Sequence, residues 1–424
     1  MIFSTCRRAA AALMLLFLSG CATHQPIQYQ ISCNYTVRDP QFLWTMASLL
    51  GTSLRNGNDV RTLSNGDEIF PPMLAAISMA QKSITLESYT YEKGNIGKKF
   101  ADALSERARA GVKVNVLLDA VGADDMDPAS RKQMDAAGVH LREYNPFHLF
   151  EPFSYAKMDH RTHRKIMVVD GLVGFIGGVG IADQWTGHAQ DAAHWRDNEY
   201  RVTGPVVGQL QAAFADNWME TTGVVLQGDE YFPLMPSGRE GGMIAQMFRS
   251  SAEGGSQTMQ LLFLLSVCGA GNTIRLETPY FVPDEQTQHY LMEARRRGVT
   301  VEVILPGDNS DMDFVRDASR ASWGKLLQAG IEIYEYQPTM LHSKLLIVDD
   351  IWVSIGSSNL DNRSFGLNAE ANLNVYDAKF AAQQVRIFEE DKTHSQRVTY
   401  DQWTHRPLFD KIRDAVAAPM SPEL

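Results

Sequence analysis

The chain has 424 residues, 44% of them hydrophobic, which is enough to bury a large core and excludes a disordered protein. Its formal net charge of -11 argues against a protein whose main work is to hold nucleic acid, because such proteins carry a basic surface. The length predicts two domains or one duplicated domain.

Residues 1–20 have the pattern of a secretory signal. Arg7 and Arg8 precede an apolar run over residues 9–18, too short to cross a bilayer comfortably as a helix, and Ser19, Gly20 and Cys21 follow. Leu-Ser-Gly-Cys also resembles a bacterial lipobox, in which the cysteine is lipidated and becomes the mature N-terminus. We expect lipid at Cys21, a membrane-anchored protein on the periplasmic side and, since Ala22 follows, the outer membrane. The alternative is an ordinary cleaved signal or an uncleaved anchor.

Residues 21–58 are predicted to form a tether with one apolar helix near Phe42 to Leu54. Two cysteines remain beyond the signal and the lipobox, Cys33 and Cys268. They are compatible with one disulfide in an oxidising periplasm and equally with buried free thiols, because sequence does not show whether they are close. No residues have metal-ligand spacing, so no metal or other cofactor is expected.

The remaining chain contains an internal repeat offset by about 190 residues. Leu86-Glu87-Ser88-Tyr89 is echoed by Leu276-Glu277-Thr278-Pro279-Tyr280, and the run starting at Gly138 is echoed from Gly330. Each copy alternates β-branched runs with segments of helical apolar spacing, which predicts layered α/β halves with a partly parallel sheet. We place the first half at residues 59–226, a Pro- and Gly-rich linker at 227–242 and the second half at 243–424.

The first half carries thirteen extra residues before its motif, because Pro146 and His163 are 17 positions apart whereas Pro338 and His342 are 4 apart. This insertion includes Phe147, Leu149, Phe150, Phe153 and Tyr155. An apolar loop beside an active site predicts contact with an acyl chain or membrane. A loop that packs back on its own domain is an equally good interpretation.

Each half contains one His-x-Lys-x-x-x-x-Asp motif. The residues concerned are His163, Lys165 and Asp170 in the first copy and His342, Lys344 and Asp349 in the second. The apolar stretch after each Lys predicts a buried strand, on which residues two apart share a face. Gly178 and Ser357 stand at the same distance beyond each motif, where a small residue lets donors approach a phosphate closely.

These residues suit phosphodiester chemistry. One neutral imidazole can attack phosphorus and form a phosphohistidine while the other protonates the leaving alcohol. Two lysines place fixed positive charge on the phosphate oxygens without a metal. Asp197 and Glu370, each downstream of a motif, are candidates for orienting the imidazoles. Asp170 and Asp349 are predicted catalytic residues, although a turn role is the alternative.

Three further segments carry a family resemblance. They are Gly356-Ser357-Ser358-Asn359-Leu360-Asp361-Asn362-Arg363-Ser364-Phe365, followed by Asn368 and Glu370; Thr278 to Pro283; and Trp195-Arg196-Asp197. They resemble the phospholipase D superfamily and, within it, the bacterial cardiolipin synthase-like group. The resemblance implies a duplicated phospholipase D-like fold, two α/β/α layered halves sharing one active site at their interface. It also implies that His163 is the nucleophile, that His342 is the acid and base, and that Lys165, Lys344 and Asn359 bind phosphate. Gly180 departs from the pattern, because many relatives have Asn in both halves.

The leading hypothesis is a phosphatidyltransferase that acts on membrane phospholipids through a phosphohistidine, as in cardiolipin synthesis from phosphatidylglycerol. A hydrolytic phospholipase D, and a phosphodiesterase or nuclease of the same fold, are the alternatives. A membrane-anchored binding protein with a dead site conflicts with the complete motifs. The expected partners are the phospholipid substrate and the membrane, with no nucleic acid and no obligate protein partner.

Overall fold

The computed structural model describes residues 27–146, 159–234, 242–251 and 258–423. All elements below belong to the unit of residues 31–424. The signal with Cys21, the insertion from Phe147 to Tyr155 and residues 235–241 of the expected linker lie outside the described residues.

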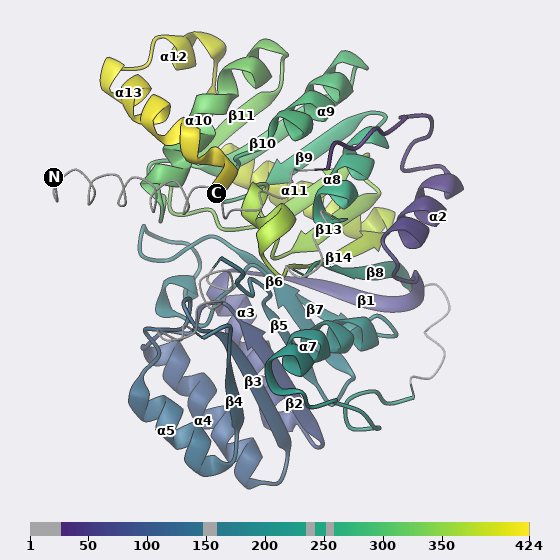
Figure 1. The fold of residues 1–424 in the computed structure, drawn as a ribbon, viewed down its shortest axis with the longest axis vertical. Coiled ribbons are helices and arrows are strands. Elements are labelled where there is room, and N and C mark those ends of the chain that lie inside the picture. Colours follow the sequence, from purple (N-terminus) through teal and green to yellow (C-terminus); the bar gives the residue numbers. More distant parts are fainter. Residues whose placement is uncertain (1–26, 147–158, 235–241, 252–257, 424) are drawn as a thin grey trace, which may run out of the picture. The chain divides into compact units, whose positions relative to one another are not determined.

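The first half alternates strands and helices as its apolar patterning predicts (Figure 1). Its elements are β1 (Arg55–Ser64), α3 (Asn65–Met79), β2 (Ser83–Ser88), α4 (Asn95–Arg109), β3 (Lys113–Asp119), α5 (Pro128–Ala137), β4 (His140–Tyr144), β5 (Ile166–Val169), β6 (Val173–Gly177), the 3-10 turn η1 (Asp183–Trp185), β7 (Asn198–Thr203) and α7 (Val207–Thr222). Local signals fix the ends of α5. Asp127 caps its first amides, Pro128 opens it and Gly138 closes it at a φ of 90°.

The second half repeats this order. Its elements are β8 (Met243–Arg249), α8 (Thr258–Cys268), β9 (Thr273–Glu277), α9 (Glu285–Arg296), β10 (Thr300–Pro306), α10 (Asp313–Gln328), β11 (Glu332–Tyr336), β12 (Leu345–Val348), β13 (Trp352–Gly356), the π-helical turn η2 (Arg363–Leu367), β14 (Ala371–Tyr376) and α11 (Ala378–Thr393). A C-terminal extension adds β15 (Ser395–Val398), α12 (Tyr400–Thr404), α13 (Leu408–Ala417) and the turn η3 (Ala418–Glu423).

Within the described residues the strands form one sheet, in the order β15-β11-β10-β9-β12-β13-β14-β8-β1-β7-β6-β5-β2-β3-β4. Strands β2, β3 and β4 are parallel, as are β9, β10 and β11, and the inner strands pair antiparallel. β1 and β8 join the halves antiparallel, with Arg55 opposite Ala245. The order is the same outward from this junction in both directions, so the duplication in the sequence is a duplication of the fold.

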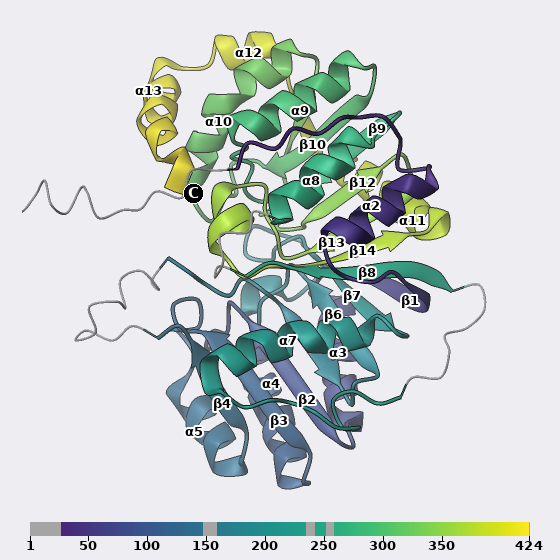
Figure 2. The same ribbon diagram turned by 45° about the vertical axis from the view of Figure 1, so that its right-hand side comes forward.

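Helices cover both faces of each half, which confirms the predicted α/β/α layers (Figures 1 and 2). In the first half α3 and α4 pack together through Phe70 and Phe100, whose ring centroids are 6.0 Å apart, and α7 packs against the opposite face. A second core is shared by the two halves and includes Val168, Ile347 and Phe380. Burial of this shared apolar surface holds the two halves together.

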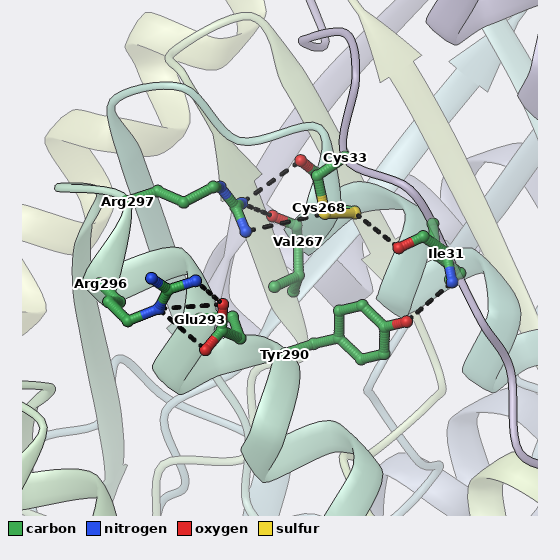
Figure 3. Close-up of a disulfide and its surroundings, with 8 residues drawn as sticks. All are labelled: Ile31, Cys33, Val267, Cys268, Tyr290, Glu293, Arg296 and Arg297. Carbon is green, nitrogen blue, oxygen red and sulfur yellow. Dashed lines mark hydrogen bonds and ion pairs between the residues drawn. A yellow bond between two sulfur atoms is a disulfide. The ribbon is translucent and has the colours of Figure 1, made fainter.

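The segment before β1 packs against the second half. Its helix α2 (Pro40–Leu49) ends earlier than the predicted Leu54, because Gly51 follows with a φ of 69° and the chain then enters β1. Phe42 meets Trp352 edge-on, with ring centroids 5.2 Å apart. The structure joins Cys33 and Cys268 in a disulfide with a Cα–Cα distance of 5.0 Å, beside Arg297 (Figure 3). No helix among the described residues is both long and apolar enough to cross a bilayer.

Candidate active site

The two motifs meet where the halves face each other. His163 and Lys165 lie just before β5, and His342 and Lys344 just before β12, so each pair precedes its strand and does not stand on it. The His163 amide donates to the Ala369 carbonyl at 2.9 Å, and the His342 amide donates to the Arg196 carbonyl at 2.7 Å. Main-chain bonds across the interface therefore hold each motif against the other half of the chain.

Each imidazole is bonded to a carboxylate from the opposite half. His163 Nδ1 lies 3.1 Å and 3.2 Å from the two carboxylate oxygens of Glu370. His342 Nδ1 lies 2.8 Å from Asp197 Oδ2. A carboxylate on Nδ1 fixes the ring and leaves Nε2 unprotonated in the neutral imidazole, which is the state a nucleophile needs. The two carboxylates predicted to orient the histidines thus do contact them, but in a crossed arrangement that joins both halves in one site.

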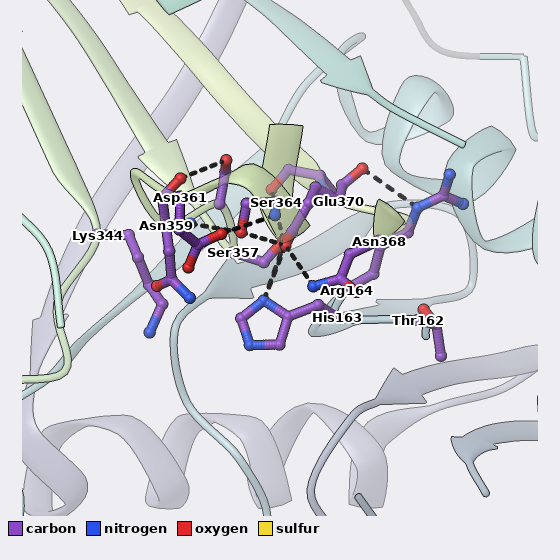
Figure 4. A network of polar contacts seen from close by, with 12 residues as sticks. Thr162, His163, Arg164, Lys344, Ser357, Asn359, Asp361, Ser364, Asn368 and Glu370 are labelled. Atoms are coloured by element: carbon purple, nitrogen blue, oxygen red, sulfur yellow. Dashed lines mark hydrogen bonds and ion pairs between the residues drawn. The ribbon is translucent and has the colours of Figure 1, made fainter. Parts of the chain in front are cut away.

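Glu370 is at the centre of a fully buried polar network (Figure 4). The hydroxyls of Ser357 and Ser364 donate to it, the latter at 2.8 Å. Burial alone would raise the pKa of Glu370, but His163, the Ser357 hydroxyl and the charge of Lys165 lower it to about 2. Ser357, which we predicted to bind substrate, therefore supports the carboxylate that orients His163.

Asp197 is held differently. The indole Nε1 of Trp185 donates to its Oδ2 at 3.0 Å, and the Asn198 amide donates to its Oδ1 at 2.8 Å. Gly178 is required here, because a Cβ at that position would lie 2.6 Å from Asp197 Oδ1. Gly178 is thus the place where the Asp197 carboxylate packs against the main chain.

The departure at Gly180 has a steric cause. A Cβ at Gly180 would lie 2.7 Å from the Thr90 Cβ and 2.9 Å from the Trp185 ring, so the first half has no room for a counterpart of Asn359. Trp185 stands five residues after Gly180, as Ser364 stands five after Asn359, and both donate to the orienting carboxylate. Aligning the two repeats places Trp185 opposite Ser364, but an indole and a hydroxyl are not similar enough for a sequence pattern to show that both donate to the carboxylate.

Both lysines are buried beside their histidines. Lys165 Nζ donates to the His163 carbonyl at 2.9 Å, and Lys344 Nζ donates to the His342 carbonyl at 2.8 Å. Lys344 Nζ also lies 3.0 Å from each nitrogen of the His342 ring. Burial lowers the pKa of Lys165 to about 8 and that of Lys344 to about 7. Loosely solvated ammonium groups of this kind gain most from an anionic phosphate placed between them.

Burial also keeps both histidines neutral at physiological pH. It lowers the pKa of His163 to about 4, against the opposing effect of Glu370, and that of His342 to about 3, where Lys344 adds to the effect. Aromatic rings surround the imidazoles: Tyr89 packs edge-on against His163, and Trp185 and Trp195 pack against His342. Tyr89 and Trp185 had not been predicted as site residues.

Asn359 lies beside Lys344 at the wall of a small cavity (Figure 4). Its amide nitrogen on the main chain donates to Ser364 Oγ at 3.0 Å, whereas its side-chain Oδ1 is buried without a partner among the described residues. Apolar side chains of α8, including Leu262 and Phe263, line the same cavity. The placement fits the predicted contact of Asn359 with phosphate.

Asp170 and Asp349 lie away from the histidines, which corrects their prediction as catalytic residues. A whole strand separates each from its lysine. Asp170 accepts the amides of Lys82 and Ser83 at 2.7 Å and 2.9 Å, and Asp349 accepts those of Asn272 and Thr273 at 2.7 Å and 2.9 Å. Both have a φ of 53°, a left-handed turn conformation that Asp tolerates. They hold the turns that precede β2 and β9, the antiparallel neighbours of β5 and β12.

Two buried arginines complete the frame. Arg164 donates to the carbonyls of Ala213 and Ser250, both at 2.6 Å, and so bridges the two halves behind His163. Arg196 forms a two-pronged ion pair with Asp391 at 2.8 Å and 2.7 Å behind Asp197. Sequence reasoning missed Arg164, because an arginine between His and Lys reads as a surface charge until the halves are packed.

Comparison with known proteins places this site in a lipid context. A family model described as "Cardiolipin synthase, PLD-like domain" matches residues 73–218 and 267–392. The cardiolipin synthase of Geobacillus kaustophilus is 36% identical over 364 residues, 85% of this chain and 72% of the relative. The major cardiolipin synthase of Bacillus subtilis is 30% identical over 399 residues, 94% and 82% of the two chains.

Solved structures show the same fold. Phosphatidylserine synthase from Haemophilus influenzae superposes with a TM-score of 0.66 over 91% of this chain and 100% of its own, at 13% identity. Polyphosphate kinase from Porphyromonas gingivalis superposes with a TM-score of 0.53 over 89% of this chain and 52% of its own, also at 13% identity. At such identities the likeness concerns architecture alone.

Proposed function

The chain belongs to the family of PLD-like cardiolipin synthase domains, and from this premise we propose that it is a phosphatidyltransferase that makes cardiolipin from two molecules of phosphatidylglycerol. The observation that carries the proposal is the pair of buried His–Lys groups, each oriented by a carboxylate from the other half. This arrangement supplies two proton-carrying imidazoles and two phosphate-binding cations in one place.

In the first step, His163 Nε2 attacks phosphorus while Glu370 holds the proton on Nδ1. The bond from phosphorus to the headgroup glycerol breaks, and His342 gives that oxygen its proton. In the empty site the pKa of His342 is about 3. The negative phosphate offsets the charge of Lys344 and raises this pKa, so protonation of His342 is coupled to substrate binding.

In the second step, the phosphatidyl group on His163 is transferred. His342, now neutral, takes the proton from a hydroxyl of a second phosphatidylglycerol, whose oxygen attacks phosphorus. The phosphorus–nitrogen bond breaks, and cardiolipin leaves. His163 and His342 are only 9% and 5% exposed, which supports transfer over hydrolysis, because water has limited access to the intermediate.

The test is incubation of the purified protein with phosphatidylglycerol vesicles and separation of the products. Cardiolipin and free glycerol in equal amounts are expected. Phosphatidic acid as the main product would show a hydrolytic phospholipase D, and cleavage of an oligonucleotide without lipid turnover would show a nuclease. A His163→Ala protein prepared in parallel controls for contaminating lipases.

The proposed location is the periplasmic side of a membrane, with lipid on Cys21. The disulfide between Cys33 and Cys268 supports it, because such bonds persist in oxidising compartments. Alkylation of intact cells followed by reduction and a second label tests this point. Protection of both cysteines from the first label is expected, and full labelling without reduction would place the protein in a reducing compartment.

A further inference from the structure

The C-terminal helix α13 and the turn η3 present a continuous apolar stripe to solvent. The exposed side chains are Leu408 (74%), Phe409 (69%), Ile412 (53%), Val416 (67%) and Met420 (50%). Positions 408, 412 and 416 are one helical turn apart, so these residues share one face of α13. Apolar patches of this extent on a soluble surface mark interaction sites.

The polarity of α13 is inverted relative to a helix that faces water. Its inward face buries Asp414, 1% exposed, which pairs with Arg406 at 2.7 Å, and its one buried apolar residue is the small Ala417; Arg413, partly exposed, pairs with Asp317 of α10 at 3.0 Å. A helix on a water-exposed surface buries apolar residues and exposes charged ones. The outward face of α13 therefore matches an apolar environment and not water.

The stripe leads toward the active site. α12 lies beside the C-terminal part of α10, where Gln328 Nε2 donates to the Tyr400 hydroxyl at 2.6 Å, whereas Arg413 of α13 meets the N-terminal part at Asp317. Beyond it, η3 also packs against α10. α13 thus runs antiparallel to α10, toward the loop before α10, and Figures 1 and 2 show it along that edge of the second half.

The loop at this end belongs to the rim of the site. Its Asp311 accepts a bond from the Tyr280 hydroxyl at 2.5 Å and faces Lys344 closely enough to affect its pKa. Met312 and Phe314, next to it, are exposed. The corresponding loop of the first half follows β3, where Asp119 accepts the amide of Thr162 at 2.9 Å and Val121 is exposed. Both halves therefore expose apolar side chains on the loop after this strand, next to an aspartate that affects the pKa of the lysine in the same half.

We propose that α13, η3 and these two rim loops form a docking surface that lies on a phospholipid bilayer, with the apolar stripe among the headgroups; this inference rests on the proposed function. The chain as a whole has a net charge of -11, which an anionic membrane repels. Residues 406–424 carry three basic and three acidic side chains, so this segment has no net side-chain charge and is not repelled. A bilayer contacts all these residues and supplies lipid at the opening, whereas a protein seated there would cover it.

The test compares binding to vesicles of phosphatidylglycerol and phosphatidylethanolamine by flotation. Full-length proteins carry Cys21→Ala, so that no attached lipid holds them on the membrane. One variant combines Phe409→Asp with Ile412→Asp. The matched control is Leu49→Asp, which changes an equally exposed apolar residue on α2, away from α13 (Figure 2).

We expect the double variant to lose about tenfold or more of its vesicle binding, and the control to bind like the parent. Turnover of phosphatidylglycerol in vesicles should fall with binding, whereas turnover of a monomeric short-chain phosphatidylglycerol should stay unchanged. Parental flotation of the double variant would overturn the proposal. The proposal would also be overturned if the parent protein were a dimer, the double variant were a monomer and both bound vesicles equally, because the apolar stripe would then be the contact between two copies.

If the double variant does not fold, as judged by its melting curve, Val416→Asp alone is subject to the same criteria. Flotation measures membrane binding and does not depend on catalytic activity. The docking surface and the proposed function can therefore be refuted independently. A parent protein that floats through α13 but turns over neither form of phosphatidylglycerol would contradict the proposed function and leave the docking surface standing.

Discussion

Replacing Glu370 by glutamine tests the crossed carboxylates most sharply. The side chain is fully buried, lies 3.1 Å from His163 Nδ1 and accepts the Ser364 hydroxyl at 2.8 Å. Glutamine has the same shape. Its amide oxygen can accept from one of the two serine hydroxyls, and its NH2 can donate to the other, because Ser357 and Ser364 bond different carboxylate oxygens. We therefore expect the fold and the melting temperature to be retained, while the negative charge opposite the imidazole is lost.

The size of the effect follows from this one contact. A hydrogen bond to a charged group contributes about 1.5–3 kcal/mol, and about 1.4 kcal/mol is a tenfold change in rate, so Glu370→Gln should slow the first step about 10- to 150-fold. If the glutamine NH2 faces Nδ1, the imidazole must carry its proton on Nε2, the atom that attacks phosphorus. The loss then approaches about 10⁴-fold.

The assay is rapid-quench measurement of glycerol released from phosphatidylglycerol within the first turnover. Ser364→Ala is the control, because it removes one bond to Glu370 but leaves the carboxylate on His163, and it should cost less than about tenfold. Turnover of Glu370→Gln within about threefold of wild type at an unchanged melting temperature would refute the idea that this carboxylate orients the nucleophile.

Four further predictions concern the same site and the N-terminus. His163→Ala and His342→Ala should each remove nearly all activity, and the double variant should be little worse, because the pair acts as a unit; near wild-type turnover in either single variant would contradict one shared site. At saturating lipid the rate should show no acid limb down to about pH 5, because His163 is protonated only near its pKa of about 4, and it should decline at alkaline pH as His342 loses its proton and as Lys344 and Lys165, whose pKa values in the empty site are about 7 and about 8, lose their charge; an acid limb near pH 6.5 would show ordinary histidines. Activity should survive EDTA, since the lysines supply the positive charge; loss that Mg²⁺ or Zn²⁺ restores would show a required metal. Palmitate labelling should disappear in Cys21→Ala, and unchanged labelling would argue against a lipoprotein.

The fold could be predicted from the sequence because each half encodes it with local signals. The echo of residues 86–89 in residues 276–280, the alternation of apolar runs and the paired motifs were enough to predict two α/β/α halves around one site. The histidines and lysines were found for the same reason, since their types and spacing are contiguous in the chain. No tertiary information was needed to recognise either.

Hydrogen-bond partners that depend on how the two halves pack could not be predicted from the sequence. Asp197 follows His163 in the chain yet bonds His342, because only the docking of the two halves decides which carboxylate meets which ring. Spacing likewise drew Asp170 into the motif, although a left-handed turn directs its carboxylate to main-chain amides. Trp185 was missed since its role is visible only once the indole is seen against Asp197.

The crossed carboxylates also constrain how such a chain arose. A polypeptide consisting of one half would hold a complete His–Lys pair and a carboxylate, but that carboxylate could not reach its own imidazole. Only a second copy related by a twofold rotation restores both contacts, so a single half would have to act as a symmetric homodimer. Joining two copies in one chain freed equivalent positions to diverge. The pairs Gly180 and Asn359, and Trp185 and Ser364, are differences that no homodimer of identical halves can possess.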